Sequence, residues 1–272
     1  MFKIGNIPIS LDSPFFVIAG PCVIEGKKIC LDIAKELVEI SKRTKVKIIF
    51  KASFDKANRS SIYGFRGIGK AEGLKVLQQV REETKLPILT DVHEIDQVGP
   101  VSQIVDCLQI PAYLCTQTDL IVACAKTGKP INIKKGQFLS PWDMKNVVEK
   151  ITSIGNKKIL LTERGVSFGY KELVNDMKSI PIMKKLGCPV VFDATHSVQC
   201  PGSLGDRTGG YWEFSPILAR SGVAAGANGV FVEVHPDPGH SKSDSATIMP
   251  IEWLEDLIID CKKIYSIVRG SR

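Results

Sequence analysis

Eight short apolar runs rich in branched side chains recur along the chain, and amphipathic stretches separate them. The runs span residues 15–19, 47–50, 87–90, 105–110, 131–133, 159–162, 189–192 and 229–234. Strands that are apolar without strict alternation are typical of parallel sheets covered on both faces. The stretches between them include 29–40, 71–83, 142–154 and 177–186, and a last helix is expected over 251–268. This order of elements predicts an α/β fold with a parallel sheet.

The number of strand–helix units favours one α/β architecture over the other. Eight units with no Pro/Ser-rich linker between two halves favour a single (β/α)8 TIM barrel over residues 1–272. Such barrels run to about 250 residues as one domain, so the length fits. A doubly wound open sheet is the alternative, which periodicity alone leaves open. Residues 1–10, with Gly5-Asn6 at a turn, are expected to form a short N-terminal β-hairpin (within residues 1–12) that plugs the barrel floor.

Charge and cysteine content limit the partners of the chain. It has 36 Lys and Arg against 29 Asp and Glu, a net charge of +7, and the basic residues are interleaved with acids along the chain. Scattered charge without a continuous basic face favours small anions over nucleic acid. No C-x-x-C pair occurs among the eight cysteines, and the apolar stretch before Cys22 is too short for a signal peptide. We therefore expect a cytoplasmic protein with reduced cysteines and with neither a membrane nor a nucleic acid as partner.

The stretch from Gly64 to Ala71 almost matches the phosphate-binding P-loop, G-x-x-x-x-G-K-[ST]. Ala71 occupies the position of the Ser or Thr that would ligate magnesium, and no apolar strand runs directly into Gly64. The stretch is therefore interpreted as a loop before a helix, and a nucleotide-hydrolysing enzyme is rejected.

Polar and ionisable residues gather at the carboxyl ends of the expected strands, which is where the active site of a barrel lies. Four cationic residues fall at or just beyond these ends: Lys51, Lys56, Lys134 and Arg164. Buried together without an anion, they would repel one another, so the site should bind phosphate or carboxylate. Two such groups on one substrate would account for the number of cations.

A second set of residues meets if the barrel closes, because strands seven, eight and one are then neighbours. Cys22 ends the first strand, His196 follows the seventh, Glu233 ends the eighth and Asp244 lies in the loop beyond it. One sulfur, one imidazole and two carboxylates suit a first-row divalent metal such as zinc or iron. No compact ligand motif supports the set, so spacing alone leaves a metal site and unrelated residues equally open. The long Gly/Pro/Ser-rich stretches 200–210 and 236–244 are candidate lids.

The run Lys51–Ser61 resembles the 3-deoxy-D-manno-octulosonate 8-phosphate synthase family. Further matching segments lie at residues 90–94, 117–120, 132–135, 163–165, 168–170, 192–199 and 235–238, so the resemblance covers nearly the whole chain. It implies a (β/α)8 barrel assembled as a homotetramer. The implied reaction condenses phosphoenolpyruvate, D-arabinose 5-phosphate and water and releases phosphate, on the route to the Kdo of bacterial lipopolysaccharide.

The resemblance also implies a role for each candidate residue. Phosphoenolpyruvate would be held by Lys51, Lys56, Lys134 and Arg164, assisted by Gln109 and the backbone near Ala112. Arabinose 5-phosphate would be held by Asn58, Arg59 and Ser60, with Asp91 on a sugar hydroxyl. Cys22, His196, Glu233 and Asp244 match the family's four metal ligands, and His196, Lys134 and Asp244 are the candidate catalytic residues. Whether His196 or the metal activates the water stays open.

Two further distinctions follow from the resemblance. Cys22 stands where a metal-independent branch of the family has Asn, and the run Lys242–Ser245 lacks that branch's Cys-Asp-Gly, so the chain resembles the metal-dependent branch. Zinc, iron, manganese and cobalt all suit the donor set. The related 3-deoxy-D-arabino-heptulosonate 7-phosphate synthases, which take erythrose 4-phosphate, are the nearest alternative. The run Asn58-Arg59-Ser60 argues against them.

Overall fold

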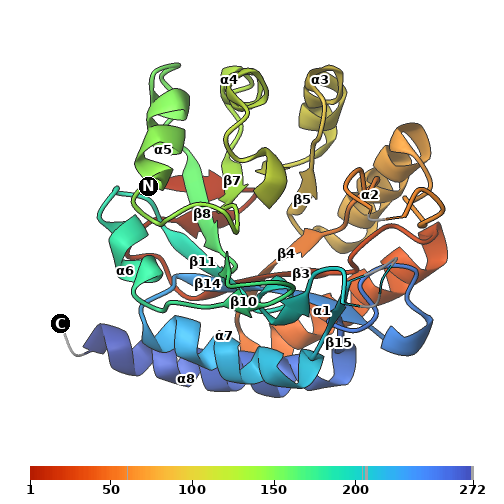
Figure 1. Cartoon of the computed structure of the whole chain (residues 1–272). Coiled ribbons are helices and arrows are strands. Elements are labelled where there is room, and N and C mark those ends of the chain that lie inside the picture. The colour runs from red at the N-terminus through yellow and green to blue at the C-terminus, as the bar shows by residue number, and fades with distance from the viewer. Residues whose placement is uncertain (60, 204, 206–207, 271–272) are drawn as a thin grey trace.

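The computed structural model describes residues 1–59, 61–203, 205 and 208–270, and a closed ring of parallel strands forms their centre (Figure 1). In order around the ring these are β3 (Phe16–Gly20), β4 (Lys47–Lys51), β5 (Ile88–Asp91), β6 (Cys107–Ile110), β7 (Ile131–Lys134), β8 (Ile159–Glu163), β11 (Val190–Asp193) and β14 (Gly229–His235). β14 pairs with both β11 and β3, which closes the ring. The predicted barrel is confirmed, and the open sheet is excluded.

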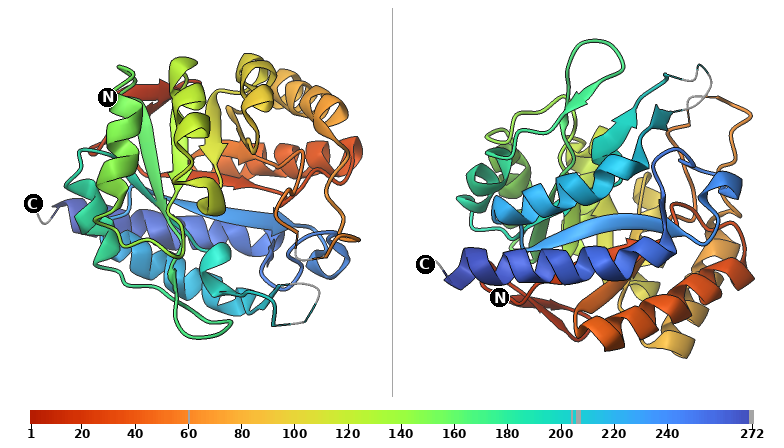
Figure 2. Two further views of the ribbon diagram at one scale, coloured as in Figure 1. Left: turned by 45° about the horizontal axis from the view of Figure 1, so that its top comes forward. Right: turned by 90° about the horizontal axis from the view of Figure 1, so that it is seen from below.

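Helices surround the ring on the outside (Figure 1). They are α1 (Lys27–Thr44), α2 (Lys70–Thr84), α3 (Ile95–Ile104), α4 (Thr118–Lys126), α5 (Met144–Thr152), α6 (Ser179–Lys184), α7 (Ser215–Ala224) and α8 (Leu254–Gly270). α7 and α8 lie side by side next to β14 (Figure 2). Outward strand residues such as Val17 and Phe50 pack with helix residues such as Leu37 in one buried cluster. α5 and α6 are shorter than expected because turns replace their first and last residues.

The hairpin of β1 (Phe2–Ile4) and β2 (Ile7–Ile9) closes the amino-terminal end of the barrel. Gly5 makes its turn at φ 56°, a conformation that costs glycine little. The three isoleucines of the hairpin, Ile4, Ile7 and Ile9, form one buried cluster with inward side chains of the barrel strands. These strand residues are Phe16, Ile18, Ile49, Leu89, Cys107, Leu160, Val191 and Phe231. The predicted plug of the barrel floor is therefore confirmed.

The inner face of the barrel changes from apolar to charged along each strand. Successive side chains of a strand point to opposite faces, so the residue two positions after an inward apolar residue also points inward. By this rule Lys51 points inward like Ile49, two residues before it, and Glu233 points inward like Phe231. The same backbone period that fills the barrel floor therefore brings ionisable groups to its mouth.

The connections at the mouth are long and partly structured. Short antiparallel pairs form between β9 (Val166–Ser167) and β10 (Leu173–Val174), and between β12 (Gln199–Cys200) and β13 (Gly209–Gly210). β15 (Met249–Pro250) extends the ring beside the end of β14. The stretch that resembles a P-loop is a loop that leads into α2, as predicted. Within the described residues, no helix combines the length and the apolar character needed to span a bilayer.

Candidate active site and metal centre

The four cationic residues at the strand ends are all buried at the barrel mouth. Lys51 Nζ donates to Glu233 Oε1 at 2.7 Å and to the Cys22 carbonyl oxygen at 3.1 Å. Lys56 Nζ lies 4.0 Å from the same Glu233 oxygen. The expectation that these cations need an external anion was incomplete, because carboxylates of the chain itself already compensate part of their charge.

Asp193, at the end of β11, joins two candidate catalytic residues. Its carboxylate accepts from Lys134 Nζ at 2.6 Å and from His196 Nδ1 at 3.0 Å, and Oδ1 also accepts from the His196 backbone N–H at 2.9 Å. Burial opposes ionisation of Asp193, but His196 and Lys134 hold the pKa of this carboxyl below its usual value. Burial lowers the pKa of His196, which favours the neutral ring, and the Asp193 carboxylate beside Nδ1 favours the tautomer with its proton on Nδ1. Nε2 is then free to bind a metal.

Asp193 is not among the site residues predicted from the sequence. A carboxylate three residues before a candidate ligand histidine, at the end of a strand, was the available signal.

The charge of Lys134 has a second partner, because its ammonium lies 3.7 Å from the centre of the Phe231 ring.

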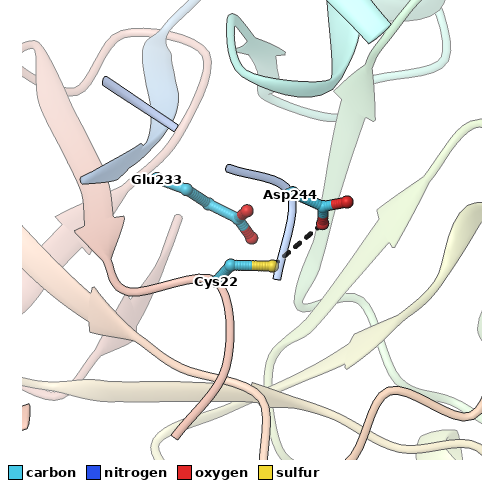
Figure 3. A group of neighbouring side chains, drawn as sticks. All are labelled: Cys22, Glu233 and Asp244. Atoms are coloured by element: carbon cyan, nitrogen blue, oxygen red, sulfur yellow. Dashed lines mark hydrogen bonds between the residues drawn. The ribbon is translucent and has the colours of Figure 1, made fainter. Parts of the chain in front are cut away.

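Three of the four predicted metal ligands point toward one another (Figure 3). One donor atom each of Cys22, Glu233 and Asp244 lies within 4.8 Å of the other two. The Cys22 thiol donates to Asp244 Oδ2 at 2.9 Å. Among the described residues, Glu233 Oε2 has no hydrogen-bond partner, although it is buried, and it lies 3.8 Å from His196 Nε2. The fourth predicted ligand is thus at the edge of the cluster.

The chemistry of this cluster fits a divalent cation. Burial raises the pKa of the Cys22 thiol well above its usual value, and the charges of Asp244 and Glu233 raise it further. A cation would relieve this crowding of acidic groups and would satisfy Glu233 Oε2. Asp244 is one of few non-glycine residues at positive φ, 48°, a conformation that is often retained at functional sites. The structure therefore contains a possible Cys/Glu/Asp metal site.

A cavity of about 350 Å³ opens above the barrel mouth. Residues of both predicted substrate sites line it, together with the loop of Asp244: Lys56, Asn58, Arg59, Arg164, His196, Gln199 and Ser241–Ser245. Arg59 Nε donates to the Phe65 carbonyl at 2.9 Å, and Arg164 donates to the His196 carbonyl at 3.2 Å. One further guanidinium nitrogen of each arginine is buried without a hydrogen-bond partner among the described residues. Both arginines thus keep donors for an anionic ligand.

The other predicted substrate residues occupy strand ends and loops around the mouth. Asp91 accepts from Ser53 Oγ at 2.6 Å and lies 3.1 Å from His93 Nε2. Gln109 Oε1 accepts from Asn132 inside the barrel. Ala112 is buried at the start of the short helix η1 (Ala112–Leu114). Ser60 lies outside the described residues.

Comparisons with known proteins identify the family of the chain. Residues 2–267 match the DAHP synthetase I family. The 2-dehydro-3-deoxyphosphooctonate aldolases of Ralstonia pickettii and Geotalea uraniireducens are 50% and 52% identical to the chain. The first alignment covers 99% of this chain and 97% of the relative, and the second covers 98% of both. The aldolase of Francisella tularensis is 49% identical over 99% of this chain and 98% of its own length. The chain therefore belongs to the DAHP synthetase I family.

Proposed function

We propose that the chain is a 3-deoxy-D-manno-octulosonate 8-phosphate synthase, the activity that its relatives carry under the name 2-dehydro-3-deoxyphosphooctonate aldolase. It condenses phosphoenolpyruvate with D-arabinose 5-phosphate and water, in the biosynthesis of the Kdo unit of lipopolysaccharide. The observation that carries this proposal is the convergence of Lys56, Arg59 and Arg164 on one cavity at the barrel mouth, where each arginine has a buried guanidinium nitrogen without a hydrogen-bond partner among the described residues. Two phosphorylated substrates need such an excess of donors.

Each substrate has its own group of residues. Phosphoenolpyruvate carries a carboxylate and a phosphate, and we assign it to Lys51, Lys56, Lys134 and Arg164, with Gln109 and Ala112 beside them. Arabinose 5-phosphate carries its phosphate at the far end of the sugar, and we assign that group to Asn58, Arg59 and Ser60. Asp91 accepts a sugar hydroxyl. This division is supported by the position of Asn58 and Arg59 in the cavity wall, away from the strand ends.

The reaction forms one carbon–carbon bond and one carbon–oxygen bond, the latter to water, and breaks the carbon–oxygen bond to phosphate. The aldehyde oxygen takes up a proton as the attacking water gives one up. C3 of phosphoenolpyruvate attacks the aldehyde carbon of the pentose, and C2 becomes electron-deficient. Water adds to C2 and loses a proton, and the C2–O bond to phosphate then breaks to release inorganic phosphate. The enzyme has to align the two substrates and to stabilise charge at the departing phosphate.

The residues around Asp193 suit these tasks. The charge of Asp193 favours the ammonium form of Lys134 beside the place assigned to phosphoenolpyruvate, and its carboxylate orients His196 so that Nε2 faces Glu233. The walls of the barrel mouth are buried, so these charges act in a medium of low polarity, where they are effective. Asp244 is placed to hold or move a proton at the water or the aldehyde oxygen. His196, whose Nδ1 faces Asp193 and whose Nε2 faces Glu233, can do so only where Nε2 holds no metal.

We also propose that the chain belongs to the metal-dependent branch of these synthases. Cys22, His196, Glu233 and Asp244 would hold zinc, iron, manganese or cobalt, which the mixed sulfur, nitrogen and oxygen donors accept. A bound divalent metal supplies Lewis acidity for the aldehyde oxygen or the water. The unpaired oxygen of Glu233 and the raised pKa of Cys22 support this assignment.

The decisive experiment compares the two candidate sugar phosphates. Purified protein supplied with divalent metal should release phosphate from phosphoenolpyruvate only when arabinose 5-phosphate is present. Equal or higher turnover with erythrose 4-phosphate would refute the proposal and would point to the heptulosonate activity for which the family is named.

We propose in addition that the chain works as a single domain in a cytoplasmic homotetramer. Aromatic side chains on the β9–β10 connection support self-association, because Phe168 is 69% and Tyr170 is 98% exposed. Light scattering coupled to size-exclusion chromatography measures the mass, and a monomeric mass would refute the tetramer.

A further inference from the structure

The loop 236–248, between β14 and β15, carries Asp244 and is tied to the barrel by Glu25. Glu25 lies in the loop after β3, three residues beyond Cys22, and its side chain is 9% exposed. Its Oε1 accepts from the Lys242 backbone N–H at 2.9 Å and from Ser241 Oγ at 3.0 Å. A single carboxylate oxygen thus connects the loop that supplies Cys22 to the loop that supplies Asp244.

The contacts continue from Glu25 to the metal cluster. Ser241 Oγ also lies 2.9 Å from the Ser243 carbonyl oxygen. Ser243 Oγ is 2.8 Å from Cys22 Sγ and 3.3 Å from Asp244 Oδ2. A displacement of Ser241 and Lys242 would therefore move the two residues that follow them, including Asp244.

Asp244 needs such support because of its backbone. A non-glycine residue at positive φ persists only where its surroundings hold it in place. On the other side of the loop, the Lys242 ammonium packs 4.9 Å from the centre of the Phe65 ring, and Lys242 is more exposed than Glu25. His235 Nε2 lies 3.7 Å from Glu25 Oε1, beyond hydrogen-bond distance, and has no hydrogen-bond partner among the described residues.

We propose that Glu25 is a positioning residue, which holds the loop 236–248 so that Asp244 is in place to bind the metal. The inference rests on the proposed metal site, although Glu25 itself is outside the ligand set. The two donors that reach Oε1 are a neutral N–H and a neutral O–H, so Gln at this position can still accept both hydrogen bonds. Ala cannot. Comparing Glu, Gln and Ala at position 25 therefore separates the effect of the hydrogen-bond acceptor from the effect of the negative charge.

Amide hydrogen exchange tests the first half of the proposal without any metal. In Glu25→Ala, the Lys242 amide and its neighbours in the loop should exchange about tenfold faster or more, because the N–H loses its acceptor. Glu25→Gln should exchange like the wild type. Asp237→Asn is the matched control, since it removes a carboxylate from the same loop whose partner, His240, is exposed. Unchanged exchange in Glu25→Ala would overturn the proposal.

Metal affinity, measured by competition with a chromophoric chelator, tests the second half. Zn²⁺ should dissociate from Glu25→Ala at about tenfold lower concentration of competitor, and Glu25→Gln and Asp237→Asn should match the wild type. Faster exchange with unchanged Zn²⁺ affinity would refute the link from Glu25 to Asp244. If the wild type binds no divalent metal, the proposed metal site is refuted, together with the link from Glu25 to metal binding by Asp244. Amide exchange still reports whether Glu25 holds the loop. If Glu25→Ala does not fold, Glu25→Asp replaces it, because its carboxylate is one methylene too short to reach both donors.

Discussion

Replacing Asp193 by Asn tests whether the barrel mouth works as one electrostatic unit. Asn keeps the size of the side chain but removes the charge that faces Lys134 Nζ at 2.6 Å and His196 Nδ1 at 3.0 Å. Removing one partner of a buried ion pair costs about 3–5 kcal/mol, because the other charge stays buried without compensation. If the transition state depends on the same pair, that energy corresponds to a loss of about 10²-fold or more in kcat/KM.

The variant should also change the pH dependence of the reaction. Burial lowers the pKa of Lys134, and the charge of Asp193 opposes that effect. Without Asp193 the pKa falls further, so the ammonium form is lost at a lower pH. The alkaline limb of the kcat/KM profile should therefore move to lower pH, and kcat/KM at acidic pH should not increase.

Phosphate release measured across pH, with urea unfolding of the same protein, checks both effects. Asp106→Asn is the matched control, because Asp106 also binds a cation (Arg81) and a backbone N–H (Ile88), but at the opposite end of the barrel. It should lower stability without changing the pH profile. The reasoning is refuted if Asp193→Asn retains kcat/KM within about threefold of the wild type and shows an unshifted alkaline limb.

Three further predictions follow from the assigned roles. Arg59→Ala should raise KM for arabinose 5-phosphate about ten- to hundredfold and KM for phosphoenolpyruvate far less, with the opposite bias in Lys134→Ala; equal effects on both substrates would show that the roles are misassigned. Cys22→Asn should contain no bound metal by elemental analysis, and a chelator should abolish wild-type turnover until metal is added back. Because the pKa of Cys22 is raised, metal binding releases a proton from the thiol, and metal affinity should therefore fall as pH falls. Full activity of metal-free protein would contradict the assignment. Ile4→Ala should lower the free energy of unfolding by about 2–5 kcal/mol in urea with kcat/KM unchanged, and an unaltered unfolding midpoint would mean that the hairpin does not support the floor.

The spacing of apolar runs was sufficient to predict the barrel, and the polar residues at the ends of those runs were sufficient to name candidates for its site. Branched apolar runs at regular intervals predict the strands, because burial on both faces requires continuous apolar residues. The ends of those runs carry Lys51, Lys134 and Glu233, and a parallel barrel brings all strand ends to one face. The hairpin plug was predictable for a similar reason, since a short apolar hairpin needs a surface to cover.

The way in which these groups compensate one another depends on contacts that form only in the folded chain. Lys51 and Glu233 are 182 residues apart, and they meet because β14 pairs with β3 when the ring closes. Asp193 holds Lys134 across 59 residues, and Glu25 reaches Lys242 across 217. Pairing of this kind depends on interatomic distance in a medium of low polarity, where a partner at hydrogen-bond distance outweighs all others. The local sequence does not specify distances between residues that are far apart in the chain, so the partner of each charge can be identified only from the folded structure.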